Sequence, residues 1–422
     1  MQRLLTFAVG RGTQTLVRVR GPFVASTRNW DPETMPSTRR RLVIGSTVAL
    51  LLGVVAVQWL TRRSEDPPAE VENLLELRNL PANRWVMYHE ERPGIWSRQG
   101  HAGMAFDSRR ESLLIFGSDT HGENWDNAVH EFRPSLKRWE THYAAVGPES
   151  YRFDEAGRPV AGRDTLLPWA MHTYDAIEYH PGLDALVVMS TTEHTPGAAR
   201  GSGRTQQPTW IYDLSTRRWS TFLNGGKPAP SFFGGSSAYD DRRQTLIAYR
   251  GAIWELDAAA GEWRRAASGH HQLHHTMVYA PGRGAAFVFG DYKPTNTIWS
   301  YRPGTSIGEA GSWEKHQPGG DACPPYSTVP VAYDAAEDVF VLVVNTVESG
   351  ATPNGKTSSA STYLYDPAAD TYTKLPDANL AAVGMNFMMA WDSRNRVVFL
   401  VTGDYHGVVT VWAMRPSKQS GK

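Results

Sequence analysis

Histidines beside carboxylates recur at one place in a repeated pattern of this 422-residue chain. Two of the motifs read Asp-Thr-His-Gly and Asp-Tyr-His-Gly, and a third is a Glu-His pair. The residues concerned are Asp119, His121, Glu193, His194, Asp404 and His406. An imidazole next to a carboxylate suits general acid–base chemistry, or a metal site in which the carboxylate orients the ligating ring. The alternative is that Asp and Gly shape the same turn in each repeat, with the imidazole solvated.

The register of the repeats brings these residues to equivalent positions. Each repeat has a turn residue, and the apolar run of a second strand begins six residues later. The turn residues are Asp107, His180, Asp240, Ala280, Asp334 and Asp392. His121, His194 and His406 each follow a turn residue by 14 positions, in three repeats that would be consecutive around a ring. A divalent metal ion held by these three histidines is therefore one hypothesis.

No other cofactor is predicted. The chain has no glycine-rich phosphate-binding loop, no His-Glu-x-x-His motif and no Gly-x-Ser-x-Gly motif.

The repeat itself is built from strands. Apolar segments lie before and after each turn residue, and two further strands rich in aromatic residues follow, which is typical of four-stranded antiparallel sheets. The last repeat has no fourth strand of its own, whereas Asn83–Tyr88 resembles the fourth strands of earlier repeats. We expect an all-β fold of six sheets over residues 83–416. The N-terminal strand, which contains Trp85, would pair with Gly407–Met414 and close a ring.

These four-stranded repeats resemble Kelch repeats, a family that includes the propeller of galactose oxidase. The first repeat, RQGHAGMAFDSRRESLLIFG followed by VHEFRPSLKRWE, carries the closest resemblance. The resemblance implies a six-bladed Kelch-type β-propeller. For galactose oxidase it also implies copper held by two tyrosines and two histidines, with one tyrosine linked to a cysteine. Cys323, with Tyr326 nearby, is the single cysteine here, and we do not expect copper oxidase chemistry.

Alternating strand directions place the loops that follow the second and fourth strands on one face, which we call the upper face. Nine of the 14 histidines map to this face. His101 and His274 lie at the entry to first strands, where the resemblance implies a channel, and Asn386 shares their register. Polar side chains around a channel mouth favour a pocket for a small polar ligand, or simply hydrate the channel. Trp125, on an upper loop, is a candidate for stacking on a sugar ring.

An insertion of 29 residues, 143–171, separates the first two repeats. Its Ala156-Gly157 pair predicts a hairpin, which we expect to cover the upper face as a lid or contact ridge.

The first 82 residues differ from the rest of the chain. Leu42–Leu60 is a 19-residue run without a charge, long enough for a transmembrane helix, and Arg39–Arg41 precede it. Because a basic flank usually stays in the cytoplasm, the propeller would lie on the extracytoplasmic side, periplasmic or extracellular. A cleaved signal peptide is the alternative to this anchor, and the Arg-rich segment 1–30 leaves a mitochondrial address open. The remaining segments would be a basic tail at 1–41, a linker at 61–82 and a C-terminal tail at 417–422. Within the linker we expect one short helical turn near Leu74, Leu75 and Leu77.

The charge distribution argues against nucleic acid as the main partner. Lys and Arg number 43 against 43 Asp and Glu, and the ten arginines of residues 1–63 leave the remainder mildly acidic. These features favour a membrane-anchored binding module for a protein partner or a glycan over an enzyme. The alternative is an enzyme of the isomerase or metal-dependent oxidase type, which would act on a small polar or sugar substrate through upper-face His and Asp residues. The sequence carries no signal for an oligomeric state.

Overall fold

The computed structural model describes residues 68–92, 100–122, 124–163, 165–192, 207–222, 229–346, 359–376, 378, 380–403 and 407–418. The expected transmembrane run at 42–60 lies outside these residues, and so do Glu193, His194, Asp404 and His406. No helix within these ranges is long and apolar enough to cross a membrane.

Six sheets of four antiparallel strands make up most of the described chain, and each sheet corresponds to one repeat of the sequence. Sheet 1 contains β2 (Gly103–Asp107), β3 (Ser112–Phe116), β4 (His130–Arg133) and β5 (Arg138–Thr141). Sheet 2 contains β9 (Ile177–His180), β10 (Ala185–Val188), β11 (Thr209–Asp213) and β12 (Arg218–Phe222). Sheet 3 contains β13 (Ser236–Asp240), β14 (Thr245–Tyr249), β15 (Ala252–Asp257) and β16 (Glu262–Ser268).

The other three sheets follow the same plan. Sheet 4 contains β17 (Thr276–Ala280), β18 (Ala285–Phe289), β19 (Ile298–Arg302) and β20 (Ser312–His316). Sheet 5 contains β22 (Val331–Asp334), β23 (Val339–Asn345), β24 (Ala360–Asp366) and β25 (Thr371–Lys374), and a short strand β21 (Gly319–Gly320) adds parallel to β25. Sheet 6 contains β26 (Met389–Asp392), β27 (Val397–Gly403), β28 (Val409–Met414) and β1 (Val86–Glu91). Short 3₁₀ turns are η2 (Thr120–Gly122), η3 (Pro134–Leu136) and η4 (Pro148–Ser150).

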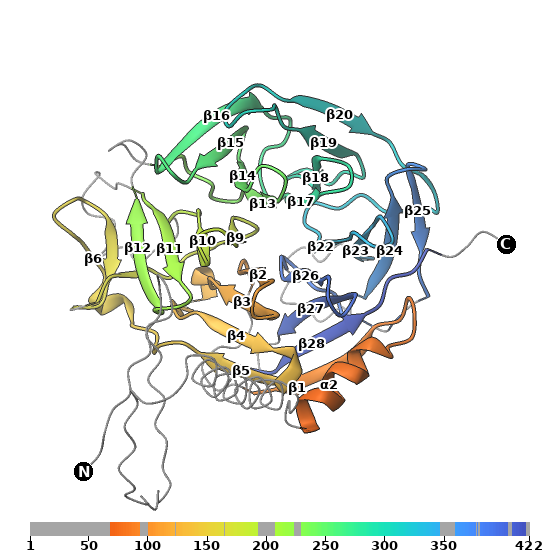
Figure 1. The fold of residues 1–422 in the computed structure, drawn as a ribbon, viewed down its shortest axis with the longest axis horizontal. Helices are drawn as coiled ribbons and strands as arrows, with labels where there is room; N and C mark the ends of the chain where they lie inside the picture. Colours follow the sequence, from red (N-terminus) through yellow and green to blue (C-terminus); the bar gives the residue numbers. More distant parts are fainter. Residues whose placement is uncertain are drawn as a thin grey trace, which may run out of the picture. The chain divides into compact units, whose positions relative to one another are not determined.

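The first strands of the six sheets lie side by side around a common centre (Figure 1). β2 contacts β9, and the series continues through β13, β17, β22 and β26, which contacts β2 again. β1 pairs antiparallel with β28 and forms the outer strand of sheet 6. The predicted pairing of the N-terminal strand with the last strand is confirmed, although the strand begins at Val86, one residue after Trp85. The arrangement is consistent with a β-propeller.

The turn residues identified in the sequence hold the turn between the first and second strands. In sheet 1, Oδ1 of Asp107 accepts the backbone N–H groups of Arg109 and Arg110 at 2.9 and 3.0 Å. The same pair of bonds occurs at Asp240, Asp334 and Asp392. Four residues after each turn residue the backbone is left-handed, with φ between +50° and +61°. These six positions are Glu111, Asp184, Gln244, Gly284, Asp338 and Arg396.

The aromatic residue of the fourth strand links a sheet to the one before it. In four of the sheets the indole N–H of a tryptophan donates a hydrogen bond to a residue of the preceding sheet or its following loop. The bonds run from Trp219 to Tyr143, Trp263 to Thr209, Trp313 to Ser268 and Trp85 to Thr362, at 2.7–2.8 Å. The recurring aromatic position in the sequence is therefore a contact between neighbouring sheets as well as a core residue.

The segment 61–82, expected to be a linker, contains a packed helix. Helix α2 spans Pro68–Arg78, and Leu77 and Leu80 are buried in the same core cluster as Tyr88 and Phe132. The Tyr88 hydroxyl donates to the carbonyl of Pro134 at 2.8 Å. The helix thus covers the place where β1 meets sheet 1, because its apolar side chains pack against residues that are distant in the sequence.

The insertion at 143–171 forms the predicted hairpin. Its strands are β6 (Arg152–Phe153), β7 (Pro159–Ala161) and β8 (Leu167–Pro168), with a left-handed Gly157 in the turn. The expected lid is not observed. β6 lies at the outer edge of the ring beside β12 (Figure 1), and Arg158 donates to Oγ1 of Thr221 in β12 at 2.6 Å. The hairpin therefore packs against the outer strand of sheet 2 and does not cover the centre of the ring.

Ion pairs join neighbouring sheets at the opposite, lower face. The guanidinium of Arg110 in sheet 1 binds both oxygens of Asp184 in sheet 2, at 2.7 and 2.8 Å, and also reaches Asp107. Similar pairs are Arg283 with Asp338 and Arg396 with Glu337. The bond from Arg110 lowers the pKa of Asp184 from its ordinary 3.8 to about 2.

We predict that Leu77→Ala lowers the free energy of unfolding by about 2–4 kcal/mol, because it removes a buried side chain from the core. Leu75 lies on the same helix and is 50% exposed, so Leu75→Ala is the matched control. Its effect should stay within about 0.5 kcal/mol. Chemical denaturation of both variants is the measurement, and equal losses would show that the helix does not pack as described.

We predict that Asp184→Asn destabilises the protein by about 1 kcal/mol at neutral pH. Because folding lowers the pKa of this carboxyl, its ion pair stabilises the folded chain above about pH 4 and is lost as the pH falls toward about 2. The difference between variant and wild type should therefore shrink over this range. Glu262→Gln serves as control, since Glu262 has no ion pair in the described part of the chain. A difference that stays constant with pH would contradict the pairing.

Candidate functional site

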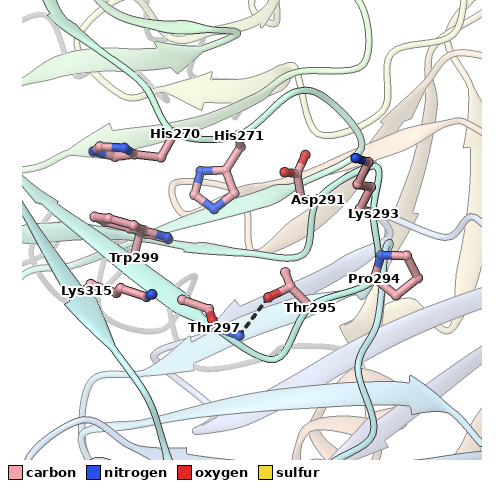
Figure 2. Close-up of a pocket in the computed structure, with 9 residues that line it drawn as sticks. All are labelled: His270, His271, Asp291, Lys293, Pro294, Thr295, Thr297, Trp299 and Lys315. Atoms are coloured by element: carbon pink, nitrogen blue, oxygen red, sulfur yellow. Dashed lines mark hydrogen bonds between the residues drawn. The ribbon is translucent and has the colours of Figure 1, made fainter.

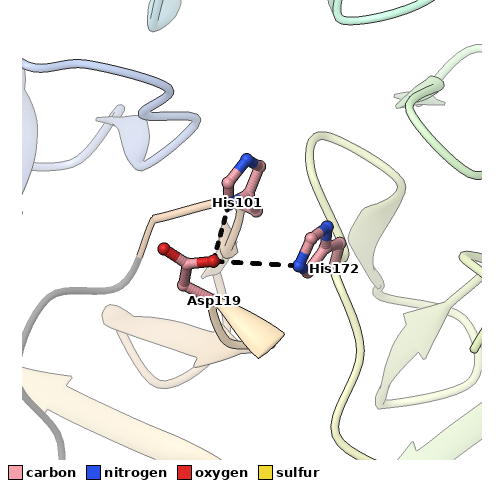
Figure 3. Close-up of side chains that lie close together, drawn as sticks. All are labelled: His101, Asp119 and His172. Atoms are coloured by element: carbon pink, nitrogen blue, oxygen red, sulfur yellow. Dashed lines mark ion pairs between the residues drawn. The ribbon is translucent and has the colours of Figure 1, made fainter. Parts of the chain in front are cut away.

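Three side chains from two neighbouring sheets meet at the upper ends of the first strands. His101 precedes β2 and Asp119 follows β3, so both stand at the same end of sheet 1, because β2 and β3 are antiparallel. His172 lies in the segment that leads into β9 of sheet 2, and β9 contacts β2. We call His101, Asp119 and His172 the axial cluster (Figure 3).

Possible ligand atoms converge in the axial cluster. Nδ1 of His101 lies 3.3 Å from Oδ1 of Asp119, and Nε2 of His172 lies 4.0 Å from the same oxygen (Figure 3). All three atoms fall within 4.8 Å of one another. The two imidazoles are stacked, with centroids 4.3 Å apart and planes inclined by 8°. Nδ1 of His101 is buried, and its polar neighbour among the described residues is Oδ1 of Asp119, with which it forms an ion pair when the ring is protonated.

His172 is held from two sides. Its Nδ1 lies 3.1 Å from the hydroxyl of Tyr174, and its Nε2 lies 2.9 Å from Oγ1 of Thr120. The His172 side chain is fully buried, whereas those of His101 and Asp119 are 15% and 20% exposed. The cluster is therefore fixed on one side and accessible from solvent on the other.

His121 lies beside the axial cluster and is exposed. Its ring centroid is 4.7 Å from that of His172 and 5.6 Å from that of His101. The backbone N–H of His121 donates to Oδ1 of Asp119 at 3.2 Å. Asp119 therefore shapes the turn, as one reading of the motif expected, and at the same time presents its carboxylate to two imidazoles.

A shared backbone conformation sets the ring of residues at the centre. His101, Tyr174, Gly234 and His274 each enter the first strand of their sheet with φ between +49° and +66°. The N–H of Tyr174 donates to the carbonyl of His101 at 2.8 Å, and the N–H of His274 donates to the carbonyl of Gly234 at 2.6 Å. Left-handed backbone is unfavourable for residues other than glycine and clusters at functional sites. Contacts between neighbouring sheets thus hold these imidazoles at the centre against a local preference.

A second group, Glu131, Glu140 and His142, also brings three possible ligand atoms together. Here the groups already satisfy one another. Nε2 of His142 bonds Glu131 at 2.9 Å and its Nδ1 bonds a tyrosine hydroxyl at 3.1 Å. Arg133 pairs with Glu131, and Arg217 pairs with Glu140 at 2.5 Å. Because two guanidinium groups neutralise the carboxylates, we interpret this group as a structural ion-pair network.

The other predicted site residues that the structure describes lie outside the axial cluster. His274 stacks on Tyr174, with centroids 5.3 Å apart, and burial lowers its pKa to about 4, helped by repulsion from His101. Asn386 bonds the backbone of its own sheet through both ends of its amide, at 2.8 and 2.6 Å, and so positions that sheet. Trp125 is half-buried on the loop before β4.

Four of the six residues in the opening motifs, Glu193, His194, Asp404 and His406, lie outside the described residues. The hypothesis of a metal ion held by His121, His194 and His406 therefore stays a prediction. Cys323 and Tyr326 lie in the core between sheets 4 and 5, where burial raises the pKa of the Cys323 thiol to about 12.

His172 was not among the predicted ligands, although it was counted on the upper face. It directly follows the long insertion, which interrupts the repeat register, and the packing of β9 against β2 brings it to Asp119. Its spacing two residues before Tyr174, which shares the register of His101, is the one signal in the sequence.

A comparison with protein-family models finds no match, and a comparison with curated proteins finds no similar sequence.

We predict that His101→Gly is more stable than His101→Ala by about 1 kcal/mol, because glycine adopts the left-handed backbone without a Cβ penalty. Lys374, exposed in strand β25, provides the control pair. There the glycine variant should be less stable than the alanine variant, as in ordinary strands. Melting temperatures of the four variants are the measurement, and the same order at both positions would contradict the described backbone.

Proposed function

We propose that this chain is a six-bladed Kelch-type propeller whose upper face binds a divalent metal ion at its centre through His101, Asp119 and His172. The convergence of three ligand atoms from sheets 1 and 2 is the observation that carries the proposal. The ring of first strands and the repeated four-stranded sheets support the propeller. The sequence motifs of the first repeat support the Kelch resemblance.

The donor set suits a metal ion. Two imidazoles and one carboxylate bind Zn²⁺, Mn²⁺, Fe²⁺ or Co²⁺. Two ligands about 2.1 Å from an ion at a tetrahedral angle lie about 3.4 Å apart. The separation of 3.3 Å matches this value, whereas the 4.0 Å separation and the parallel stacking of the two imidazoles require the rings to turn before both lone pairs, which lie in the ring planes, reach one ion. With Nε2 of His172 as ligand, this nitrogen would give up its hydrogen bond with Thr120, and Nδ1 would carry the proton and donate to Tyr174.

Three protein ligands leave coordination positions on the exposed side of the cluster. A hydroxyl or carbonyl oxygen of a small polar molecule, such as a sugar, would fill such a position. His121 is exposed beside the cluster and is placed to move a proton to or from that molecule. This arrangement favours a site that acts on a small polar ligand.

The sequence favoured a binding module for a protein partner or a glycan. We favour the small-molecule site because a protein-binding face does not require two imidazoles that converge on one carboxylate oxygen. A glycan stays compatible with the proposal, since its hydroxyl groups are oxygen ligands. The uncharged run at 42–60 supports a membrane anchor with the propeller outside the cytoplasm.

We predict that the full-length protein, stripped with a chelator and dialysed against Zn²⁺ or Co²⁺, retains about one ion per chain. Asp119→Ala and His172→Ala should each weaken binding by at least about tenfold, because each removes a ligand. Elemental analysis gives the stoichiometry, and the visible spectrum of the Co²⁺ form reports the ligand set.

Glu140→Gln is the matched control, because it removes one possible ligand of the second group and leaves the axial cluster intact. It should retain the metal. Loss of the metal in Glu140→Gln, with retention in Asp119→Ala, would move the site to the second group. Absence of stoichiometric metal in the wild type would refute the proposal.

A further inference from the structure

A polar pocket lies at sheet 4 (Figure 2), and none of its lining residues belongs to the axial cluster. Its volume is about 250 Å³, enough for a small molecule. The β16–β17 connection, the β18–β19 loop and the strands β19 and β20 form its walls. The residues that matter here are His271, Asp291, Lys293, Thr295, Trp299 and Lys315.

The hydrogen bonds of Tyr249 assign the proton of His271. The Tyr249 hydroxyl accepts the backbone N–H groups of His270 and His271 at 2.7 and 2.8 Å. Its own proton is therefore left to donate to Nδ1 of His271, which lies 3.0 Å away. Burial lowers the pKa of His271 to about 4, so the ring is neutral at physiological pH and Nε2 carries its proton. The ring points into the space between Trp299 and Thr295, so that Nε2 is a donor to the pocket (Figure 2).

Gly269 makes this arrangement possible. A Cβ at this position would lie 2.1 Å from the ring of Tyr249. Only glycine therefore lets the chain pass close enough for the Tyr249 hydroxyl to reach the two following N–H groups.

The indole of Trp299 is fixed and presents a second donor. His270 stacks on it, with centroids 4.0 Å apart and planes inclined by 13°, and Nζ of Lys315 lies 6.0 Å from the ring centroid. The indole nitrogen faces the pocket (Figure 2). No described residue accepts a hydrogen bond from it.

The charges of the pocket are mostly positive. Lys293 and Lys315 line it, and neither forms an ion pair with another described residue. Asp291 is the one acid among the lining residues, and its Oδ1 already accepts the backbone N–H groups of Gln272, Leu273 and Tyr292. One oxygen of the carboxylate therefore holds the loop, and two lysines against one acid leave the lining side chains with an excess of positive charge.

We propose that this pocket binds a small oxyanion, a carboxylate, sulfate or phosphate group, through the His271 imidazole, the Trp299 indole and the two lysines. Two fixed neutral N–H donors and two cations, with the neighbouring acid engaged by backbone, are the groups that recognise such an anion. The pocket is independent of the metal site proposed above.

The test is isothermal titration of the full-length protein with sodium phosphate, sulfate or acetate, in a chelator and at constant ionic strength set with chloride. We expect saturable binding of one anion per chain. Binding of acetate alone would identify a carboxylate as the ligand, and binding of phosphate or sulfate would identify a tetrahedral oxyanion. Trp299→Phe keeps the ring on His270 but removes the N–H donor, and should weaken binding about tenfold.

Lys315→Met should weaken binding to a similar degree. Because Lys315 is exposed, this variant should fold normally, and it serves as the test if Trp299→Phe does not fold. Lys374→Met removes an exposed lysine of strand β25, outside the pocket, and should bind as the wild type does. Equal weakening in Lys374→Met would reduce the effect to general surface charge and overturn the proposal. Absence of saturable binding by all three anions would also overturn it.

Discussion

The pairing of β1 with β28 is the contact on which the rest of the structure depends. Each sheet packs on its two neighbours, and a chain of sheets without closure would expose apolar faces and a strand edge at both ends. β1 supplies the outer strand of sheet 6, and Trp85 just before it donates to Thr362 in sheet 5. Helix α2 then covers the place where β1 meets sheet 1. A ladder of backbone hydrogen bonds thereby joins the first and the last strand of the six sheets.

Closure also fixes the centre of the ring, where the axial cluster lies. His101 enters β2 in the left-handed conformation, and its carbonyl accepts the N–H of Tyr174 from the next sheet. In an isolated sheet no contact would offset the unfavourable left-handed backbone of this histidine. Contact between two sheets thus brings His172 within 4.0 Å of Asp119 and holds the possible ligands in place. The packing of sheet 1 on sheet 2 therefore holds these polar side chains close to one another.

The two proposed sites differ in how the protein prepares them. In the axial cluster a carboxylate faces two imidazoles, which favours a cation. In the pocket of sheet 4 the acid Asp291 is engaged by backbone N–H groups, which leaves an excess of donors and favours an anion. One connection, 269–275, serves both regions, because it carries His271 into the pocket and His274 to the ring of Tyr174.

The repeated four-stranded unit could be predicted from the sequence. Turn residues such as Asp107 accept backbone N–H groups within three residues, and apolar second strands are buried on both faces, so both signals are local and survive in the sequence pattern. The aromatic position of the fourth strand and the pairing of the first strand with the last also followed from the register. Asp119, His121 and His101 were identified by their type and offset.

Other features, namely helix α2, the position of the hairpin and the side chains that meet at the centre, depend on contacts between distant parts of the chain. Helix α2 is stabilised by a distant core, so local composition indicated a linker. The hairpin of the insertion is held outward by a bond from Arg158 to Thr221, which no spacing encodes. His172 reaches Asp119 only because β9 packs on β2, and Asn386 is engaged by its own sheet although its register resembles that of His101. Local hydrogen bonds and periodic burial are written in the sequence, whereas the choice of which side chains meet depends on how separate sheets pack.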